Sequence, residues 1–275
     1  MEEQIFTWVR IALSLSFLTY SSWSDLKSRE VSNTVWKVFA PLALLVTSIQ
    51  FLFYPPFSRF ISLSSLDATA NAFVNYGISF ALTSIFSVAL FYVGAFGGAD
   101  AKALMCIALA LPVPPNLYSP LSGFVSFVFP ITIFSNGVIV AAMSLFYALF
   151  RNLIWKLRTS QDLFEGYESE SFWRKALALL CGYKLSVQDL EKSFSYPLED
   201  LSIVEGSIAK RLLLFPKDEN REHMVEKIVE ASREGRISNM VWATPGLPML
   251  IFITIGLVIA LTIGDIVWIA IGQVF

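Results

Sequence analysis

The sequence predicts an all-α polytopic membrane protein with about six transmembrane helices and a small cytoplasmic α+β insert. The chain has 275 residues, of which 55% are hydrophobic and 15% are charged, whereas a soluble domain usually carries about 25% charged residues. The charges are also unevenly placed, because 14 of the 20 Lys and Arg residues lie between Arg151 and Arg236. Long apolar stretches on both sides of that segment predict a membrane domain interrupted by one soluble insert.

Six apolar segments are candidate spans, because a helix crosses the hydrocarbon core with about 20 residues. The fourth is short for a full span, and it is ended by a run of prolines that cannot continue a helix. In chain order the segments are Ile5–Trp23, Val35–Tyr54, Ala72–Val93, Ala103–Pro112, Gly123–Phe150 and Leu247–Ile271. The resulting division is a membrane domain over 1–154, a soluble insert over 155–240 and a final transmembrane helix within 241–275.

The insert shows shorter patterns of its own. Apolar and charged residues at helical spacing predict helices at Phe172–Cys181, Val187–Ser193 and Lys217–Arg233, the last of them stopped by Gly235. Large apolar residues at Ile208–Phe215 predict a strand. A small α+β domain follows from this mixture.

The positive-inside rule predicts the orientation. Short connections at Ser24–Thr34 and Gly94–Lys102 carry Lys and Arg, as does the insert, whereas Pro55–Asn71 carries only Arg59 and Val113–Ser122 none. The N-terminus is therefore expected outside, and the first set of connections together with the insert is expected in the cytoplasm. The acidic start Met1-Glu2-Glu3, with no small-residue cleavage signature before Asp25, predicts a retained span rather than a removed signal peptide.

Several classes of function are disfavoured by composition. The net charge of −2 gives no basic face for nucleic acid. Cys106 and Cys181 are far apart, and His223 is the only histidine and lies in a charged segment, so no metal site and no cofactor are expected. Arg10 and Asp265 are expected near the outer membrane surface.

Two isolated aspartates are the candidate catalytic residues. Asp25 follows the first apolar stretch, and Asp100 follows the third within Gly94-Ala95-Phe96-Gly97-Gly98-Ala99-Asp100-Ala101-Lys102. An acidic residue at a membrane boundary is a functional-site hypothesis by default. Both aspartates fall in the same set of connections, hence at the same membrane face. Two close carboxyl groups share one proton and can hydrolyse a peptide bond without a metal or a nucleophilic side chain.

Plainer interpretations of both residues stay open at this point. Asp100 is also suited to a turn in which it caps a helix N-terminus, and Asp25 next to Lys27 and Arg29 is also typical of an ordinary cytoplasmic loop. Lys102 either orients Asp100 or marks the inner face. Gly94, Gly97 and Gly98 remove side chains beside the carboxylate and let a substrate backbone approach.

The segment Gly97-Gly98-Ala99-Asp100-Ala101-Lys102 resembles the GxGD-type signature of the type IV prepilin peptidases, with Ala99 in place of the second glycine. The segment 25–33, Asp-Leu-Lys-Ser-Arg-Glu-Val-Ser-Asn, is similar to the first aspartate motif of that family. A short segment before the last span is similar to sequences of the archaeal branch, the preflagellin and pilin signal peptidases. It reads Thr244-Pro245-Gly246-Leu247-Pro248.

The resemblance implies an aspartic endopeptidase that removes the short basic leader of archaellin or pilin-like precursors at the cytoplasmic face, with Asp25 and Asp100 as the catalytic pair. Bacterial members carry a large loop with paired CxxC motifs after the first span, associated with N-methylation. That loop is about ten residues here, so we expect no methyltransferase activity. Glu30, or the acidic residues of Glu165–Glu170, would attract the basic leader.

Two rival interpretations remain. A presenilin or signal-peptide-peptidase type of protease shares a Gly-rich aspartate motif but places its first aspartate inside a span, which Asp25 after Ser24 fits poorly. A transporter or channel would be expected to show midplane polar residues, broken helices in matched positions and repeat symmetry, and none is evident in the sequence. A structural membrane scaffold is the alternative if Asp25 and Asp100 are dispensable. The precursor that is cleaved and the oligomeric state are not specified by the sequence.

Overall fold

The computed structural model describes residues 2–56, 63, 65–115, 126–204, 207–213 and 221–272, and within it the chain forms two compact units. The first unit contains Met1–Ala141 and Pro248–Phe275, and the second contains Ala142–Leu247. The bounds of these compact units do not show where the membrane surface lies. The predicted boundaries between membrane domain and insert, at 154/155 and 240/241, therefore stay a prediction. Arg59 and the start of the fifth predicted span lie outside the described residues.

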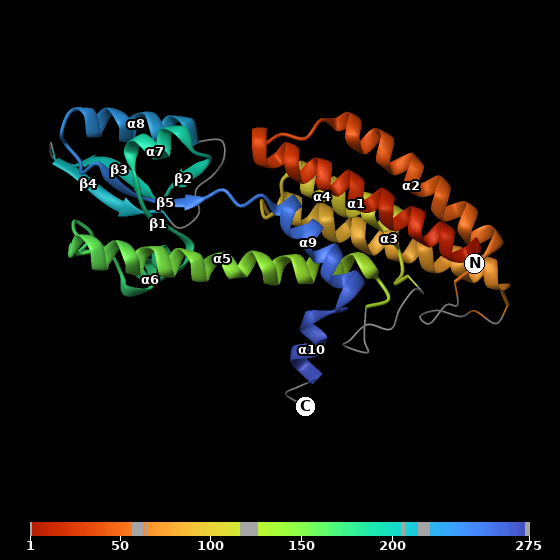
Figure 1. The fold of residues 1–275 in the computed structure, drawn as a ribbon. Helices are drawn as coiled ribbons and strands as arrows, with labels where there is room; N and C mark the ends of the chain where they lie inside the picture. The colour runs from red at the N-terminus through yellow and green to blue at the C-terminus, as the bar shows by residue number, and fades with distance from the viewer. Residues whose placement is uncertain are drawn as a thin grey trace. The chain divides into compact units, whose positions relative to one another are not determined.

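The first unit is a helical bundle. It contains α1 (Glu2–Ser28), α2 (Asn33–Phe53), α3 (Ala68–Tyr92), α4 (Gly98–Ala110), the first part of α5 (Phe129–Thr159), α9 (Met249–Thr262) and α10 (Ile266–Gly272). Helix α4 packs against α1, α2, α3 and α9 and is largely surrounded by them (Figure 1). Its buried small and apolar side chains, such as Ala103, Leu104 and Ile107, form the centre of the core.

The fold class predicted from the sequence is confirmed as a mostly α, polytopic membrane protein. Helices α2, α3 and α5 are long and apolar enough to cross a membrane, and the pair α9 and α10, bent by 56°, would make a fourth crossing. The first and fourth predicted spans correspond to α1 and α4, which are helical but are not among these candidates. A total of six crossings therefore stays a prediction.

The short helix α4 can end inside the bundle because side chains from three other helices bind its last carbonyl groups. At 13 residues it is about 20 Å long, less than the roughly 30 Å of a hydrocarbon core. Arg10 Nη1 and Thr47 Oγ1 donate to the Ala110 carbonyl at 3.2 and 3.1 Å, and Tyr76 donates to the Leu109 carbonyl at 3.0 Å. Carbonyl groups at a helix end cost several kcal/mol if they are buried without partners in an apolar medium.

Arg10 is therefore not the outward-reaching side chain expected from the sequence. It is 2% exposed, and its guanidinium lies 5.6 Å from the centre of the Phe51 ring. The polar end of α4 gives the guanidinium a partner inside the bundle, so it does not extend to the membrane surface.

The last predicted span is broken rather than continuous. Gly264 has φ +101° between α9 and α10, and two side chains of α5 bind the backbone and the acid at this break. Asn136 donates to the Gly264 carbonyl at 2.8 Å and accepts from the Ile266 N–H at 3.0 Å, while Thr132 donates to Asp265 at 2.9 Å. Asp265 is thus buried, at 4% exposure, and its position near the outer membrane surface stays a prediction.

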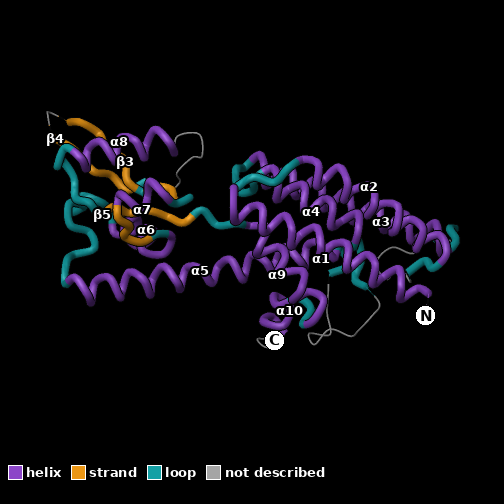
Figure 2. Tube along the Cα trace, turned by 45° about the horizontal axis from the view of Figure 1, so that its top comes forward, coloured by secondary structure: helices purple, strands orange, loops and turns teal. Residues whose placement is uncertain are grey.

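The second unit is an α+β domain (Figures 1 and 2). Its elements are the end of α5, α6 (Phe172–Cys181), β1 (Tyr183–Ser186), α7 (Val187–Lys192), β2 (Ser195–Pro197), β3 (Glu199–Val204), β4 (Ser207–Leu212), α8 (Arg221–Arg233) and β5 (Met240–Pro245). Strand β5 pairs antiparallel with β1 on one side and β2 on the other, and β3 pairs with β4.

Alternate side chains along β5 pack into two different apolar clusters. Val241 and Ala243 pack with Val225 and Ile228 of α8, whereas Trp242 packs with Ala178 of α6 and neighbouring residues. Successive side chains of a strand point to opposite faces, so β5 joins the two clusters. The expected helices at 172–181 and 187–193 are confirmed, and the strand expected at 208–215 and the helix expected at 217–233 match β4 and α8 over the residues that are described.

Candidate active site

Asp25 lies in the last turn of α1, where the sequence predicted a loop. The helix continues to Ser28 and stops because Arg29 adopts φ +57°, a conformation that seldom occurs outside glycine. Ser24 and Ser28 hydroxyls then donate to the Glu30 carbonyl at 2.8 and 3.2 Å. This turn fixes the end of α1 and holds Asp25 partly buried at the boundary of the bundle.

Asp100 lies in the first turn of α4, and its carboxylate binds the start of its own helix. Oδ2 accepts a hydrogen bond from the Gly97 N–H at 3.0 Å, as acidic residues near helix N-termini commonly do. The capping arrangement considered from the sequence is therefore present. It leaves the other carboxylate oxygen, Oδ1, outside this hydrogen bond.

Burial raises the pKa of Asp100 to about 6, and the Gly97 N–H and the Arg29 guanidinium lower it while the Asp25 carboxylate raises it. The pKa of Asp25 is also raised by burial and lowered by Arg29. Since the charge of Asp25 acts on Asp100 and that of Arg29 acts on both, the structure brings these three side chains into one electrostatic cluster. Both aspartates lie outside the predicted spans, at the adjoining ends of α1 and α4.

Lys102 does not orient Asp100 directly. Its ammonium donates to Asn33 Oδ1 at 2.7 Å, and Asn33 is the first residue of α2. This bond ties the start of α4 to the segment that follows Asp25.

Asn33 and Arg29 belong to the first aspartate motif, but the sequence alone gave neither of them a role in the site. The turn at Arg29 and the contact between α2 and α4 are not visible in the sequence.

Each glycine before Asp100 suits its position for a different physical reason. Gly94 has φ +79° in the turn after α3, which side chains rarely adopt. Gly97 has an ordinary backbone, but a Cβ there would lie 3.2 Å from Asp100 Oδ2. At Gly98 a Cβ would only touch the Phe91 ring at 3.8 Å. Ala99 is partly buried and packs against the bundle core.

We expect Gly97→Ala to reduce leader cleavage by about tenfold, because a Cβ would displace the carboxylate of Asp100, the candidate catalytic group, and small displacements of such a group weaken catalysis. Gly98→Ala is the matched control and should stay within about twofold of wild type, since 3.8 Å is an ordinary contact. Steady-state cleavage of a precursor in detergent measures both. Equal rates for the two variants would contradict the close approach of Gly97 to the carboxylate.

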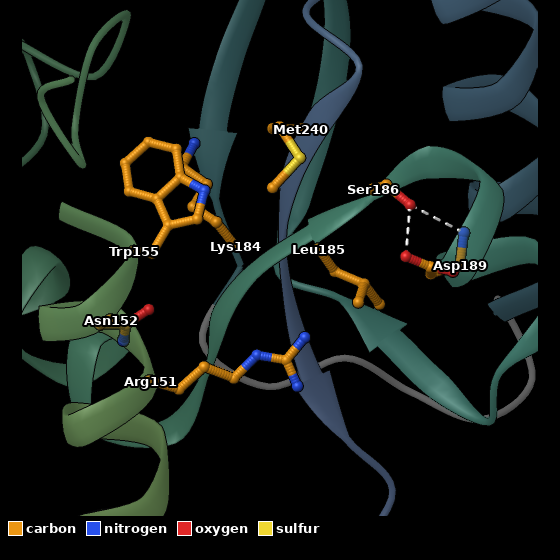
Figure 3. A pocket seen from close by; sticks show the side chains of 8 residues that line it. All are labelled: Arg151, Asn152, Trp155, Lys184, Leu185, Ser186, Asp189 and Met240. Atoms are coloured by element: carbon orange, nitrogen blue, oxygen red, sulfur yellow. Dashed lines mark hydrogen bonds between the residues drawn. The ribbon is translucent and has the colours of Figure 1, made fainter. Parts of the chain in front are cut away.

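A separate cavity of about 240 Å³ lies within the second unit (Figure 3). Arg151, Asn152 and Trp155 of α5 line one side of it, and Lys184 and Leu185 of β1 line another. Ser186 and Asp189 hydrogen-bond to each other at its edge, at the start of α7. Neither candidate catalytic aspartate lines it. Within the described ranges, no group of three or more His, Cys, Asp or Glu residues is arranged to hold a metal ion.

The fold and this carboxyl pair define a polytopic membrane protein with two acidic residues at one end of a helical bundle. Comparison with known sequences identifies the class more closely: the type IV leader peptidase family matches residues 12–150, and the archaeal peptidase A24 C-terminus type II matches residues 174–266. The chain therefore belongs to the type IV leader peptidase family, and it is a leader-peptide protease.

Two relatives are similar over nearly their whole lengths. The preflagellin peptidase of Methanococcus voltae is 26% identical over 263 residues, covering 94% of this chain and 96% of the relative. The preflagellin peptidase of Methanococcus maripaludis (strain C6) is 22% identical over 253 residues, covering 90% and 92% respectively. The family recognised from the two aspartate motifs is confirmed.

Proposed function

We propose that this chain is an aspartic endopeptidase that removes the leader of archaellin or pilin-like precursors, with Asp25 and Asp100 as its catalytic pair. The observation that carries the proposal is the placement of both aspartates at adjoining ends of α1 and α4, where the charge of Asp25 acts on Asp100. The names of the two relatives support archaellin precursors as substrates.

The chemistry requires one ionised and one protonated carboxyl group. We assign the proton to Asp100, because its pKa is raised by burial and by the Asp25 charge. Asp25 removes a proton from water as the water oxygen attacks the scissile carbonyl carbon, and Asp100 donates its proton to the carbonyl oxygen. Collapse of the tetrahedral intermediate then returns a proton to Asp100, while Asp25 passes its proton to the departing amine.

The two carboxyl groups must approach each other for this reaction. Among the described residues no hydrogen bond joins Asp25 to Asp100, whereas a shared proton needs oxygen atoms within about 3 Å. The Lys102–Asn33 bond limits how far the start of α4 can move from α2. We therefore propose that Lys102 positions Asp100 through α2 and that closure occurs when a precursor binds.

The proposed site is at the cytoplasmic face, as the distribution of Lys and Arg favours. A precursor with a basic leader and an apolar helix would place its junction at that boundary, where a peptide bond can leave its helix more easily than at the midplane. Glu30 is exposed just after the end of α1 and stays our predicted contact for the basic leader. Glu30→Lys should weaken binding of the precursor.

The proposed function is tested by mass spectrometry of the product formed from an archaellin precursor. We expect one cut at the leader junction, and the new N-terminus should carry no methyl group even when a methyl donor is supplied. Cuts at several positions would contradict a leader peptidase. A methylated product would contradict the proposed lack of methyltransferase activity.

The pH dependence follows from the two aspartates. With Asp100 as the proton-holding group at a pKa of about 6, kcat/KM should fall as pH rises above that value and should fall again in acid as Asp25 becomes protonated.

Arg29 lowers the pKa values of both Asp25 and Asp100. Arg29→Gln should raise both and move the whole profile to higher pH.

Lys27→Gln is the matched control for Arg29→Gln, since Lys27 is an exposed cation in the same turn and lies over the Trp23 ring at 5.2 Å. It should leave the profile in place. A shift of the Arg29→Gln profile to lower pH would contradict the assigned cluster.

A further inference from the structure

Helix α6 exposes its apolar side instead of burying it. Phe172 and Trp173 are 75% and 74% exposed, and Leu177 is 40% exposed. Of its residues only Ala178 is buried, in the cluster around Trp242. With 3.6 residues per turn, Trp173, Leu177 and Leu180 lie on the side of the helix opposite Ala178. An amphipathic helix in a soluble domain normally turns this side to the core.

The part of α5 that contacts α6 also exposes an apolar side. Phe146, Phe150, Leu153 and Leu157 are 67%, 64%, 53% and 73% exposed. Their spacing of four, three and four residues places them on one stripe. The opposite side of the helix carries Ala148 and Asn152, which are buried. Asn152 donates to the carbonyls of Leu179 and Gly182 at 3.2 and 2.8 Å, which ties this part of α5 to α6.

An α5 that crosses the membrane is long enough for this stripe to lie at a membrane surface. Its 31 residues make about 46 Å of helix, compared with a hydrocarbon core of about 30 Å. One end of an α5 that crosses the membrane therefore lies among the lipid headgroups. Exposed Lys156 and Arg158 lie beside the stripe at that end, where long basic side chains can reach the headgroups while their stems stay in the apolar layer.

Aromatic residues at the start of α6 have the composition of a membrane interface. The Phe172 and Trp173 rings pack edge to face with centroids 5.7 Å apart, and tryptophan is enriched where apolar lipid meets water. Arg174 and Lys175 follow directly. Arg174 is paired with Glu170 at 3.2 Å, and the Lys175 ammonium lies 5.9 Å from the centre of the Phe164 ring. Such a helix lies in the plane of the interface, with its apolar side in the acyl chains.

We propose that α6 is an interfacial helix, and that its exposed side and the α5 stripe together seat the second unit in the headgroup–acyl boundary of the bilayer. The lipid surface is the occupant because the stripe is part of α5, which is itself a membrane-span candidate. An apolar surface of this kind would otherwise face water. The insert is then a membrane-seated domain and not a freely soluble one.

The test is the depth of a fluorescent label in the full-length protein in lipid vesicles. In a Cys106→Ala, Cys181→Ser background, an environment-sensitive fluorophore is attached to Leu177→Cys of α6. Glu226→Cys of α8, an exposed position in the same unit, is the matched control. Each protein is reconstituted in phosphatidylcholine vesicles with and without lipid brominated in the acyl chain, and aqueous iodide is the second quencher.

At position 177 we expect strong quenching by brominated lipid and about threefold less quenching by iodide than at position 226, as for a helix buried in the interface. Equal iodide quenching at both positions would overturn the proposal. Protection from iodide without quenching by brominated lipid would also overturn it, since a second copy of the chain would then cover this side. Neither readout depends on peptidase activity, so the result is independent of the proposed function.

Discussion

Asp100→Asn is expected to reduce leader cleavage by on the order of 10⁴-fold, the scale of losing an essential member of a catalytic group. Asparagine keeps the shape of the side chain, and its amide oxygen can still accept the Gly97 N–H that Asp100 Oδ2 now binds at 3.0 Å. The fold of the α4 start should therefore survive. The variant lacks the proton that we propose polarises the substrate carbonyl, so the effect is expected on the chemical step.

Asp67→Asn supplies the control for Asp100→Asn. Asp67 caps α3 by accepting the Ala70 N–H at 2.7 Å, so it makes the same kind of helix-start bond without a proposed catalytic role. Cleavage by this variant should remain within about twofold of wild type, because asparagine caps helices as well as aspartate does. Comparable losses in both variants would indicate that only helix capping matters.

Arg10→Met is expected to have the second largest effect, on stability. Among the described residues, Thr47 would then be the remaining side-chain partner of the Ala110 carbonyl. Hydrogen bonds to charged groups contribute about 1.5–3 kcal/mol each. We expect the unfolding temperature in detergent to fall by several degrees. Cleavage should fall as well, because α4 carries Asp100 at its other end.

A matched variant separates this effect from the simple loss of a charge on α1. Lys27→Met removes an exposed cation from the same helix, and it should leave the unfolding temperature within about a degree of wild type, as surface changes usually do. An unchanged unfolding temperature for Arg10→Met would show that the α4 end needs no such partner.

The sequence predicted most helices of the bundle, because most are long apolar segments bounded by polar or proline-containing connections. It could not predict how α4 ends, since the partners Arg10, Thr47 and Tyr76 come from three other helices. The break at Gly264 was missed for a similar reason: Asn136 and Thr132 of α5 bind it across the bundle. In the second unit, β4 was the one strand predicted.

The two aspartates of the proposed site could be selected from the sequence, whereas their neighbours could not. Asp25 and Asp100 stand out because acidic residues are rare beside apolar segments, and motif resemblance selected the same two residues. Their electrostatic link through Arg29 depends on one positive φ angle, and the Lys102–Asn33 bond depends on helix packing. Neither can be read from residue spacing.

The most direct test of the central claim, that the two aspartates act as one unit, compares Asp25→Asn, Asp100→Asn and the double variant in precursor cleavage. Each single variant should lose nearly all activity, and the double variant should be no slower than the slower single one, because a pair that shares one proton fails when either member is removed. Losses that multiply in the double variant, or wild-type cleavage by either single variant, would contradict the account.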